Sequence, residues 1–276
     1  MNKNLKAALD ILLYIVVFFL IQYIFVVATG VIGMWVGGWA WNAIGDAFVH
    51  GGFQLSGKMM VVATVLSSIM TLCLFAKLKW GPVSRNWLKT KPFGVLIWAA
   101  IAALGTILPS EWIVEELQYT MPEATEKLFE QIMGEPTGYI AIGLLAPLAE
   151  ELVFRGAILR KLLGMFNEKW HWAAIVISAL IFGAVHGNLP QFVHASLIGL
   201  LLGWMYYRTK SIIPGVLFHW VNNTVAYVMF NVMPQMADGK LIDLFHGDHK
   251  MLVLSLIFSL FILIPSLLQL NLRMKK

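Results

Sequence analysis

The sequence has little charge: only 13% of its 276 residues are Asp, Glu, Lys or Arg, whereas 59% are hydrophobic. A soluble domain carries about a quarter charged residues, so this chain has too few to cover a globule of its size in water. The alternative solvent is lipid, and a bilayer core of about 30 Å needs roughly 20 apolar residues per crossing helix. The sequence supplies such stretches repeatedly, which predicts one integral membrane domain over residues 1–276.

Cysteine is nearly absent as well. The single cysteine, Cys73, excludes an internal disulfide and leaves the redox compartment open. Because Cys73 lies in an apolar run, we interpret it as a packing residue. The formal charge of +5 does not indicate a nucleic-acid partner, because the basic residues lie in short loops between apolar runs.

The apolar runs predict an all-α, polytopic bundle of about eight transmembrane helices. The first run, Ile11 to Ala28, is longer than a signal-peptide core and lacks a convincing cleavage site, so we interpret it as a retained first span. The turn signal Gly187 to Pro190 separates the fifth span from the sixth. The expected spans are residues 9–35, 59–78, 93–110, 136–159, 171–188, 190–207, 212–233 and 251–270.

Lys and Arg in the short loops predict the orientation. Every second loop is basic, both termini fall on the basic side, and residues 111–135 contain seven Glu and one Lys. Eight spans with both termini in the cytoplasm, in the inner membrane of a prokaryotic cell, satisfy this pattern. The basic residues are Lys3, Lys6, Lys77, Lys79, Arg85, Lys89, Lys91, Arg160, Lys161, Lys169, Arg208, Lys210, Arg273, Lys275 and Lys276.

Two outer segments are less regular. We expect Gly37 to Gly57 to be a loop near the interface. Glu111 to Met133 has apolar residues spaced among its glutamates, so it is either an amphipathic helix on the outer surface or an irregular loop.

The fourth span carries three ionisable residues, although each costs about 2.5–3.5 kcal/mol at a span centre. Glu151 and Arg155 are four residues apart and share a helix face, whereas Glu150 points about 100° away from Glu151. We therefore expect Arg155 to pair with Glu151 and to leave Glu150 unpaired. Pro147, just before them, removes a backbone hydrogen bond and favours a bend.

Later spans carry imidazole and carboxamide groups. His186 follows Phe182 by one turn, and His219 and Asn223 share a face while Asn222 points elsewhere. Each pair taken singly is also explained by hydrogen bonding between helices. His194 has no obvious partner and is read as structural or secondary. Counting residues along each span from the loops places His186 farther from the cytoplasm than Glu150 and His219.

Together these residues suit peptide hydrolysis. A carboxylate in an apolar surround is a strong general base for water, and an adjacent imidazole can hold the water or share its proton. His219 and Asn223 can donate hydrogen bonds to a tetrahedral oxyanion. The set Glu150, His186 and His219 is alternatively a zinc-hydrolase ligand combination, held across helices because no H-E-x-x-H motif is present.

Three motifs occur in order: E-E-x-x-x-R at Glu150, Glu151 and Arg155, F-x-x-x-H at Phe182 and His186, and H-x-x-x-N at His219 and Asn223. This trio on consecutive apolar helices resembles the CPBP intramembrane proteases, which include type II CAAX prenyl endopeptidases and Abi-like bacteriocin-processing proteins. The motifs cover roughly residues 147–223, and the catalytic core is expected within about 136–233.

The resemblance implies an endopeptidase acting in a membrane-embedded cavity on membrane-anchored or lipidated, CAAX-like polypeptides. By resemblance, Glu150 and His186 activate water, His219 and Asn223 stabilise the oxyanion, and Glu151, Arg155 and Phe182 support the site. The family is often called metalloprotease, yet these roles need no metal and no organic cofactor. The alternatives are a non-catalytic immunity or scaffold protein, and a proton-coupled transporter, against which the absence of broken-helix repeats argues.

Overall fold

A computed structural model describes residues 2–50, 55–82, 87–233 and 240–274, and within these ranges the chain is helical without any strand. The predicted all-α class is therefore confirmed. Three basic residues used to predict the orientation, Arg85, Lys275 and Lys276, lie outside the described ranges.

Each of the eight predicted spans coincides with a helical segment. The fourth is composite: π-helical η2 (Tyr139–Leu145), α6 (Ala146–Glu151), π-helical η3 (Leu152–Leu159) and α7 (Arg160–Met165) follow one another without interruption. The other seven are α1 (Lys3–Val36), α3 (Gly57–Lys77), α4 (Phe93–Glu116), α8 (His171–Ala184), α9 (Leu189–Thr209), α10 (Ile213–Val232) and α11 (His249–Arg273).

Five of these helices are individually long and apolar enough to cross a bilayer: α1, α3, α4, α9 and α11. Their mean hydropathies lie between 1.2 and 2.8. The other segments are shorter, less apolar or composite, so the count of eight crossings stays a prediction. The chain is nonetheless an integral membrane protein by the repeated occurrence of such helices.

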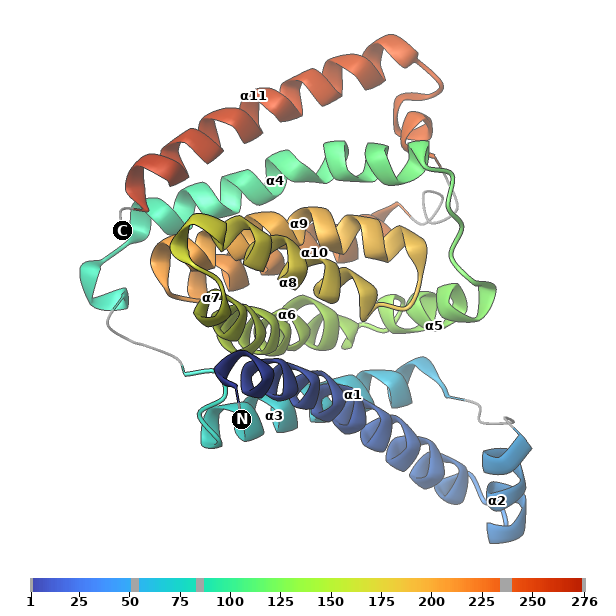
Figure 1. Cartoon of the computed structure of the whole chain (residues 1–276). Coiled ribbons are helices and arrows are strands. Elements are labelled where there is room, and N and C mark those ends of the chain that lie inside the picture. Colours follow the sequence, from blue (N-terminus) through green and yellow to red (C-terminus); the bar gives the residue numbers. More distant parts are fainter. Residues whose placement is uncertain (1, 51–54, 83–86, 234–239, 275–276) are drawn as a thin grey trace.

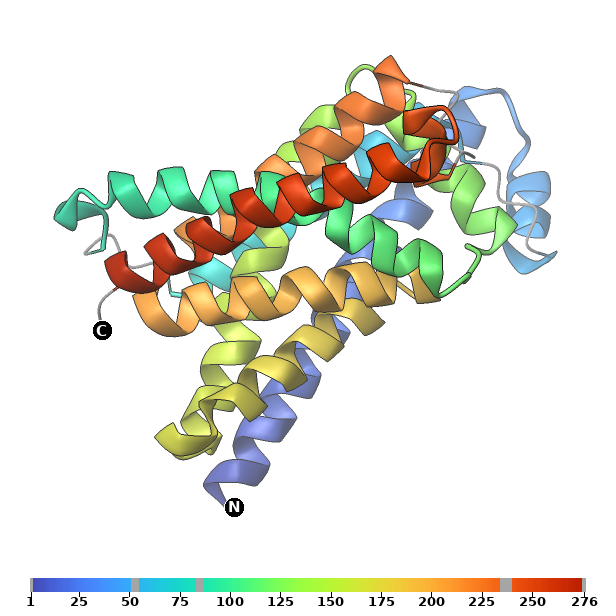
Figure 2. The same cartoon turned by 90° about the horizontal axis from the view of Figure 1, so that it is seen from above.

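The helices form layers (Figures 1 and 2). Helices α4 and α11 pack side by side on one flank, α1 and α3 pack together on the opposite flank, and α6 to α10 lie between them. Only 11% of the apolar window of α11 and 22% of that of α1 is buried, so these outer helices present apolar side chains outward. That pattern is expected when lipid covers the outer faces of a bundle.

The structure corrects three details. The segment expected as a loop at Gly37–Gly57 contains the ten-residue helix α2 (Trp41–His50). Helix α4 runs to Glu116, six residues beyond the predicted span. Of the two alternatives for the acidic stretch, the amphipathic helix is present as α5 (Glu123–Met133). Cys73 is exposed on α3, so its interpretation as a packing residue is wrong.

The turn between α8 and α9 has the features that its sequence predicts. Gly187 adopts a positive φ of 72°, which costs a residue without a Cβ little. Asn188 then caps α9, because its side-chain oxygen accepts a hydrogen bond from the Gln191 amide at 3.0 Å. Helix α8 ends at Ala184, so Phe182 lies in its last turn and His186 lies in the turn that follows.

Candidate active site

Glu151 and Arg155 form a buried ion pair. The Nη1 atom of Arg155 donates to Oε1 of Glu151 at 2.9 Å, and the two side chains are 1% and 0% exposed. The guanidinium also lies 4.2 Å from the centroid of the Phe182 ring, and its Nη2 donates to the carbonyl of Gly199 at 3.4 Å. The expected pairing is present, and the pair lies in the protein interior instead of at the end of the span.

Two glycines on neighbouring helices make room for this pair. A Cβ at Gly215 on α10 would lie 2.7 Å from Oε2 of Glu151, and one at Gly199 on α9 would lie 3.3 Å from Nη2 of Arg155. The absence of side chains there lets α9 and α10 approach the fourth helix closely. The ion pair is thus enclosed by backbone from two helices.

Glu150 points to a different environment. Its Oε2 lies 3.7 Å from Nε2 of His219, and its side chain is partly exposed. The other ring nitrogen of His219, Nδ1, lies 3.4 Å from Oε1 of Glu151. The imidazole therefore sits between two carboxylates, of which Glu151 is held by Arg155 and Glu150 is not. The adjacency of the two glutamates gives them separate surroundings, as the helix geometry predicts.

The Phe182 ring connects the three motifs. It makes edge-to-face contacts with His186 and His219, with ring centroids 5.3 and 5.8 Å apart, in addition to its contact with Arg155. Nδ1 of His186 lies 2.9 Å from the carbonyl of Phe182. Because a carbonyl only accepts, Nδ1 carries hydrogen and the neutral ring has its lone pair on Nε2. His186 thus lies near the other motifs, although residue counting from the loops placed it at a different depth in the membrane.

Asn223 is oriented by a carbonyl group of the fourth helix that has no backbone hydrogen-bond partner. Its Nδ2 donates to the carbonyl of Ile142 at 3.0 Å. The amide of Ala146 bonds to Ala141 in a π-type turn, and Pro147 has no amide hydrogen, so neither amide can pair with Ile142. Pro147 and the π turn together leave this carbonyl to the Asn223 side chain.

The sequence did not predict a cluster of polar side chains that contacts Asn223 and consists of Glu111, His194 and Asn222. Nδ1 of His194 lies 3.2 Å from Oε1 of Glu111, and Asn222 Nδ2 lies 3.5 Å from His194 Nε2. Asn222 also donates to Oδ1 of Asn223 at 3.4 Å. His194 therefore has partners, contrary to the expectation. The available signal was that Glu111 and His194 are both ionisable residues near ends of apolar segments.

The described residues include no ready-made metal-ligand group at Glu150, His186 and His219. Within the ranges that the structure describes, no three His, Cys, Asp or Glu side chains are grouped closely enough to hold a metal ion. Glu150, His186 and His219 accordingly do not form a ready ligand set, and we assign no step to a metal.

Two cavities adjoin the helix that carries Glu150. A small one of about 50 Å³ contacts Glu150 itself and, on another side, four hydroxyl side chains of α3. The second, of about 350 Å³, is lined only by apolar residues and lies between α3, the fourth helix and the start of α10. The apolar lining consists of Leu72, Ala76, Leu148, Leu152, Ile212, Ile213 and Val216.

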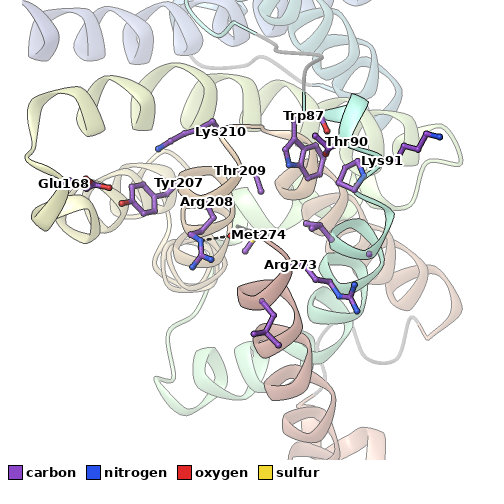
Figure 3. Close-up of a pocket in the computed structure, with 14 residues that line it drawn as sticks. Trp87, Thr90, Lys91, Glu168, Tyr207, Arg208, Thr209, Lys210, Arg273 and Met274 are labelled. Carbon is purple, nitrogen blue, oxygen red and sulfur yellow. Dashed lines mark hydrogen bonds between the residues drawn. The ribbon is translucent and has the colours of Figure 1, made fainter. Parts of the chain in front are cut away.

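A larger pocket of about 870 Å³ lies at the ends of α4, α9 and α11, and contains none of the predicted site residues (Figure 3). Four cations line it together with one carboxylate, Glu168. Arg208 lies at its centre and donates from Nε to the carbonyl of Met274 at 2.8 Å, which satisfies the end of α11. The cations are Lys91, Arg208, Lys210 and Arg273, so the pocket belongs to the predicted cytoplasmic face.

Comparisons with known proteins agree with the motifs. Residues 134–225 match the family described as type II CAAX prenyl endopeptidase Rce1-like. The chain is 29% identical over 175 residues to the Bacillus subtilis (strain 168) protein named "Putative membrane peptidase YdiL", covering 61% of this chain and 70% of that one. No solved structure matches the chain. The resemblance to the CPBP intramembrane proteases, with their type II CAAX prenyl endopeptidases, is confirmed.

Proposed function

We propose that the protein is an intramembrane endopeptidase that hydrolyses peptide bonds of membrane-anchored or lipidated polypeptides. The observation that carries the proposal is that the adjacent glutamates have different partners. Arg155 is committed to Glu151, while Glu150 faces His219 at 3.7 Å and borders a polar cavity. A carboxylate without a cation partner, held beside an imidazole and a cavity large enough for water, is suited to act as a general base.

The proposed reaction assigns a role to each motif residue. Glu150, assisted by Nε2 of His186, takes a proton from water, and the water oxygen attacks the scissile carbonyl carbon. His219 and Asn223 donate hydrogen bonds to the oxyanion that forms. Glu150 then returns the proton to the leaving amine as the C–N bond breaks. Asn223 is prepared for this role because its Oδ1 and one Nδ2 hydrogen are engaged by Asn222 and Ile142.

The apolar cavity supports a lipid anchor on the substrate. Leu148 and Leu152 line it from the helix that carries Glu150, although residues two positions away point to nearly the opposite helix face from Glu150. Its volume of about 350 Å³ lies within the range of small-molecule sites. A hydrocarbon chain in this cavity would hold the substrate against the helix that carries Glu150, and the attached peptide would have to pass around that helix to reach the carboxylate. We propose that both termini are cytoplasmic and that the peptide enters from that side.

A matched pair of synthetic peptides tests this function. The two share one sequence and differ only in a farnesyl group on a cysteine near the C-terminus. We expect purified protein to cleave the farnesylated peptide at least about tenfold faster, because burial of the farnesyl group in the apolar cavity adds binding energy. Cleavage is measured by mass spectrometry, with a pool of membrane-derived peptides as a third substrate.

The outcomes separate the parts of the proposal. Equal rates on the two peptides would remove the lipid anchor from the proposed substrate and leave the peptidase activity standing. Cleavage of neither peptide, nor of any peptide in the pool, would contradict the proposed function.

A further inference from the structure

The small cavity beside Glu150 is lined on one side by a stripe of hydroxyl groups. Thr64, Ser67, Ser68 and Thr71 follow the spacing i, i+3, i+4, i+7 on α3, so they share one helix face. Phe18 and Gln22 of α1 close a second side, and Ala146, Ala149 and Glu150 form the third. Apart from Phe18 and the two alanines, every lining residue offers a polar group.

Thr71 is the distinctive member of this stripe. Its side chain is 0% exposed, and its Oγ1 atom has no hydrogen-bond partner among the described residues. Hydroxyls inside helices usually donate to a carbonyl three or four residues back, as Ser67 does to Thr64 and Thr106 does to Ala103. A buried hydroxyl without a partner costs about 1–3 kcal/mol. Its persistence points to a partner in the cavity.

The size and chemistry of the cavity match water. Its volume is about 50 Å³, and one buried water needs roughly 10–15 Å³ of such space. A buried water typically makes about three hydrogen bonds, and the hydroxyls, Gln22 and the Glu150 carboxylate offer more than that number. A hydrocarbon chain would leave these polar groups unsatisfied, so lipid is excluded as the occupant.

We propose that this cavity supplies the water that Glu150 activates, and that Thr71 is a positioning residue for this water before it moves to the carboxylate and His186. The inference rests on the role proposed for Glu150 and adds α1 and α3 to a site otherwise built from the fourth helix, α8 and α10. Water reaches the carboxylate from the α3 side, so the peptide can occupy the side that faces His219 and Asn223. Thr71 acts through the water and does not touch the substrate.

Replacement of Thr71 by valine tests the inference with the farnesylated peptide. We expect kcat to fall about tenfold or more with little change in KM, because valine keeps the shape and removes the hydroxyl. Thr71→Ser should restore most of the rate, and the melting temperature of Thr71→Val should not fall. The matched control is Thr106→Val, which removes a buried hydroxyl from α4 that is bonded to its own helix. Unchanged kcat in Thr71→Val, with Glu150→Gln inactive, would overturn the inference and leave the proposed function intact.

A second readout does not depend on activity. In a Cys73→Ala background, the thiol of Thr71→Cys should react with Ag⁺, an ion close to water in size, because water in the cavity lets the thiol ionise. Thr106→Cys should not react under the same conditions. Absence of reaction at residue 71 would show that the cavity holds no accessible water and would overturn the inference, whether or not a substrate is cleaved.

Discussion

Replacement of Glu150 by glutamine is expected to lower the rate of peptide cleavage by roughly 10²–10⁴-fold, the usual loss when a general base is removed. Glutamine has nearly the same shape but cannot accept the proton of water. Arg155 stays paired with Glu151 in this variant, so the protein should insert and fold normally. The rate is measured on the farnesylated peptide with purified protein in detergent, and folding is measured by thermal unfolding.

The matched control for this variant is Glu123→Gln, which removes one exposed carboxylate from α5. It should leave the rate unchanged. If Glu150→Gln kept more than about a tenth of the wild-type rate, Glu150 would not be the general base.

Replacement of Arg155 by alanine is expected to lower the free energy of unfolding by about 3–5 kcal/mol, because Glu151 would remain buried without its counterion. Glu151→Gln should act in the same direction, since it leaves a buried guanidinium without a carboxylate. Activity should fall in both variants, because Glu151 and Phe182 support His219. Thermal or denaturant unfolding in detergent gives the size of the effect.

An exposed pair with the same spacing serves as the comparison. Lys127 and Glu123 are also four residues apart on one helix, but their side chains are 64% and 79% exposed. Lys127→Ala should cost less than about 1 kcal/mol, because water already solvates both charges. Equal losses for Arg155→Ala and Lys127→Ala would show that the Glu151–Arg155 pair behaves as if it were at the surface.

Local sequence patterns were sufficient to predict most of the helices and which motif residues meet. Runs of apolar residues predicted every long helix, because an apolar stretch of about 20 residues has few other uses. The spacing of four residues predicted the Glu151–Arg155 pair. The occurrence of the E-E-x-x-x-R, F-x-x-x-H and H-x-x-x-N motifs in this order along the chain predicted that the helices carrying them meet. The structure brings these groups together around Phe182. Their catalytic roles stay predictions.

Contacts between distant residues were not predictable in the same way. Glu111 and His194 are recognisable as ionisable residues near the ends of apolar segments, but their local sequence does not pair them with each other. The missing amide hydrogen of Pro147 likewise does not reveal that Asn223 uses the carbonyl of Ile142. The hydroxyl stripe on α3 is readable from its spacing, but Ser and Thr are common in membrane helices and often only bond their own backbone. Thr71 is distinguished by a buried hydroxyl group that has no hydrogen-bond partner among the described residues and borders the cavity beside Glu150.

The most direct measurement of the central claim follows the oxygen of water. Purified wild-type protein and Glu150→Gln are incubated with the farnesylated peptide in water enriched in ¹⁸O, and the products are analysed by mass spectrometry. The account predicts a new peptide C-terminus carrying one ¹⁸O atom in its carboxylate with the wild type, and almost none with Glu150→Gln. Labelled product at equal rates from both proteins, or no cut peptide from the wild type, would contradict it.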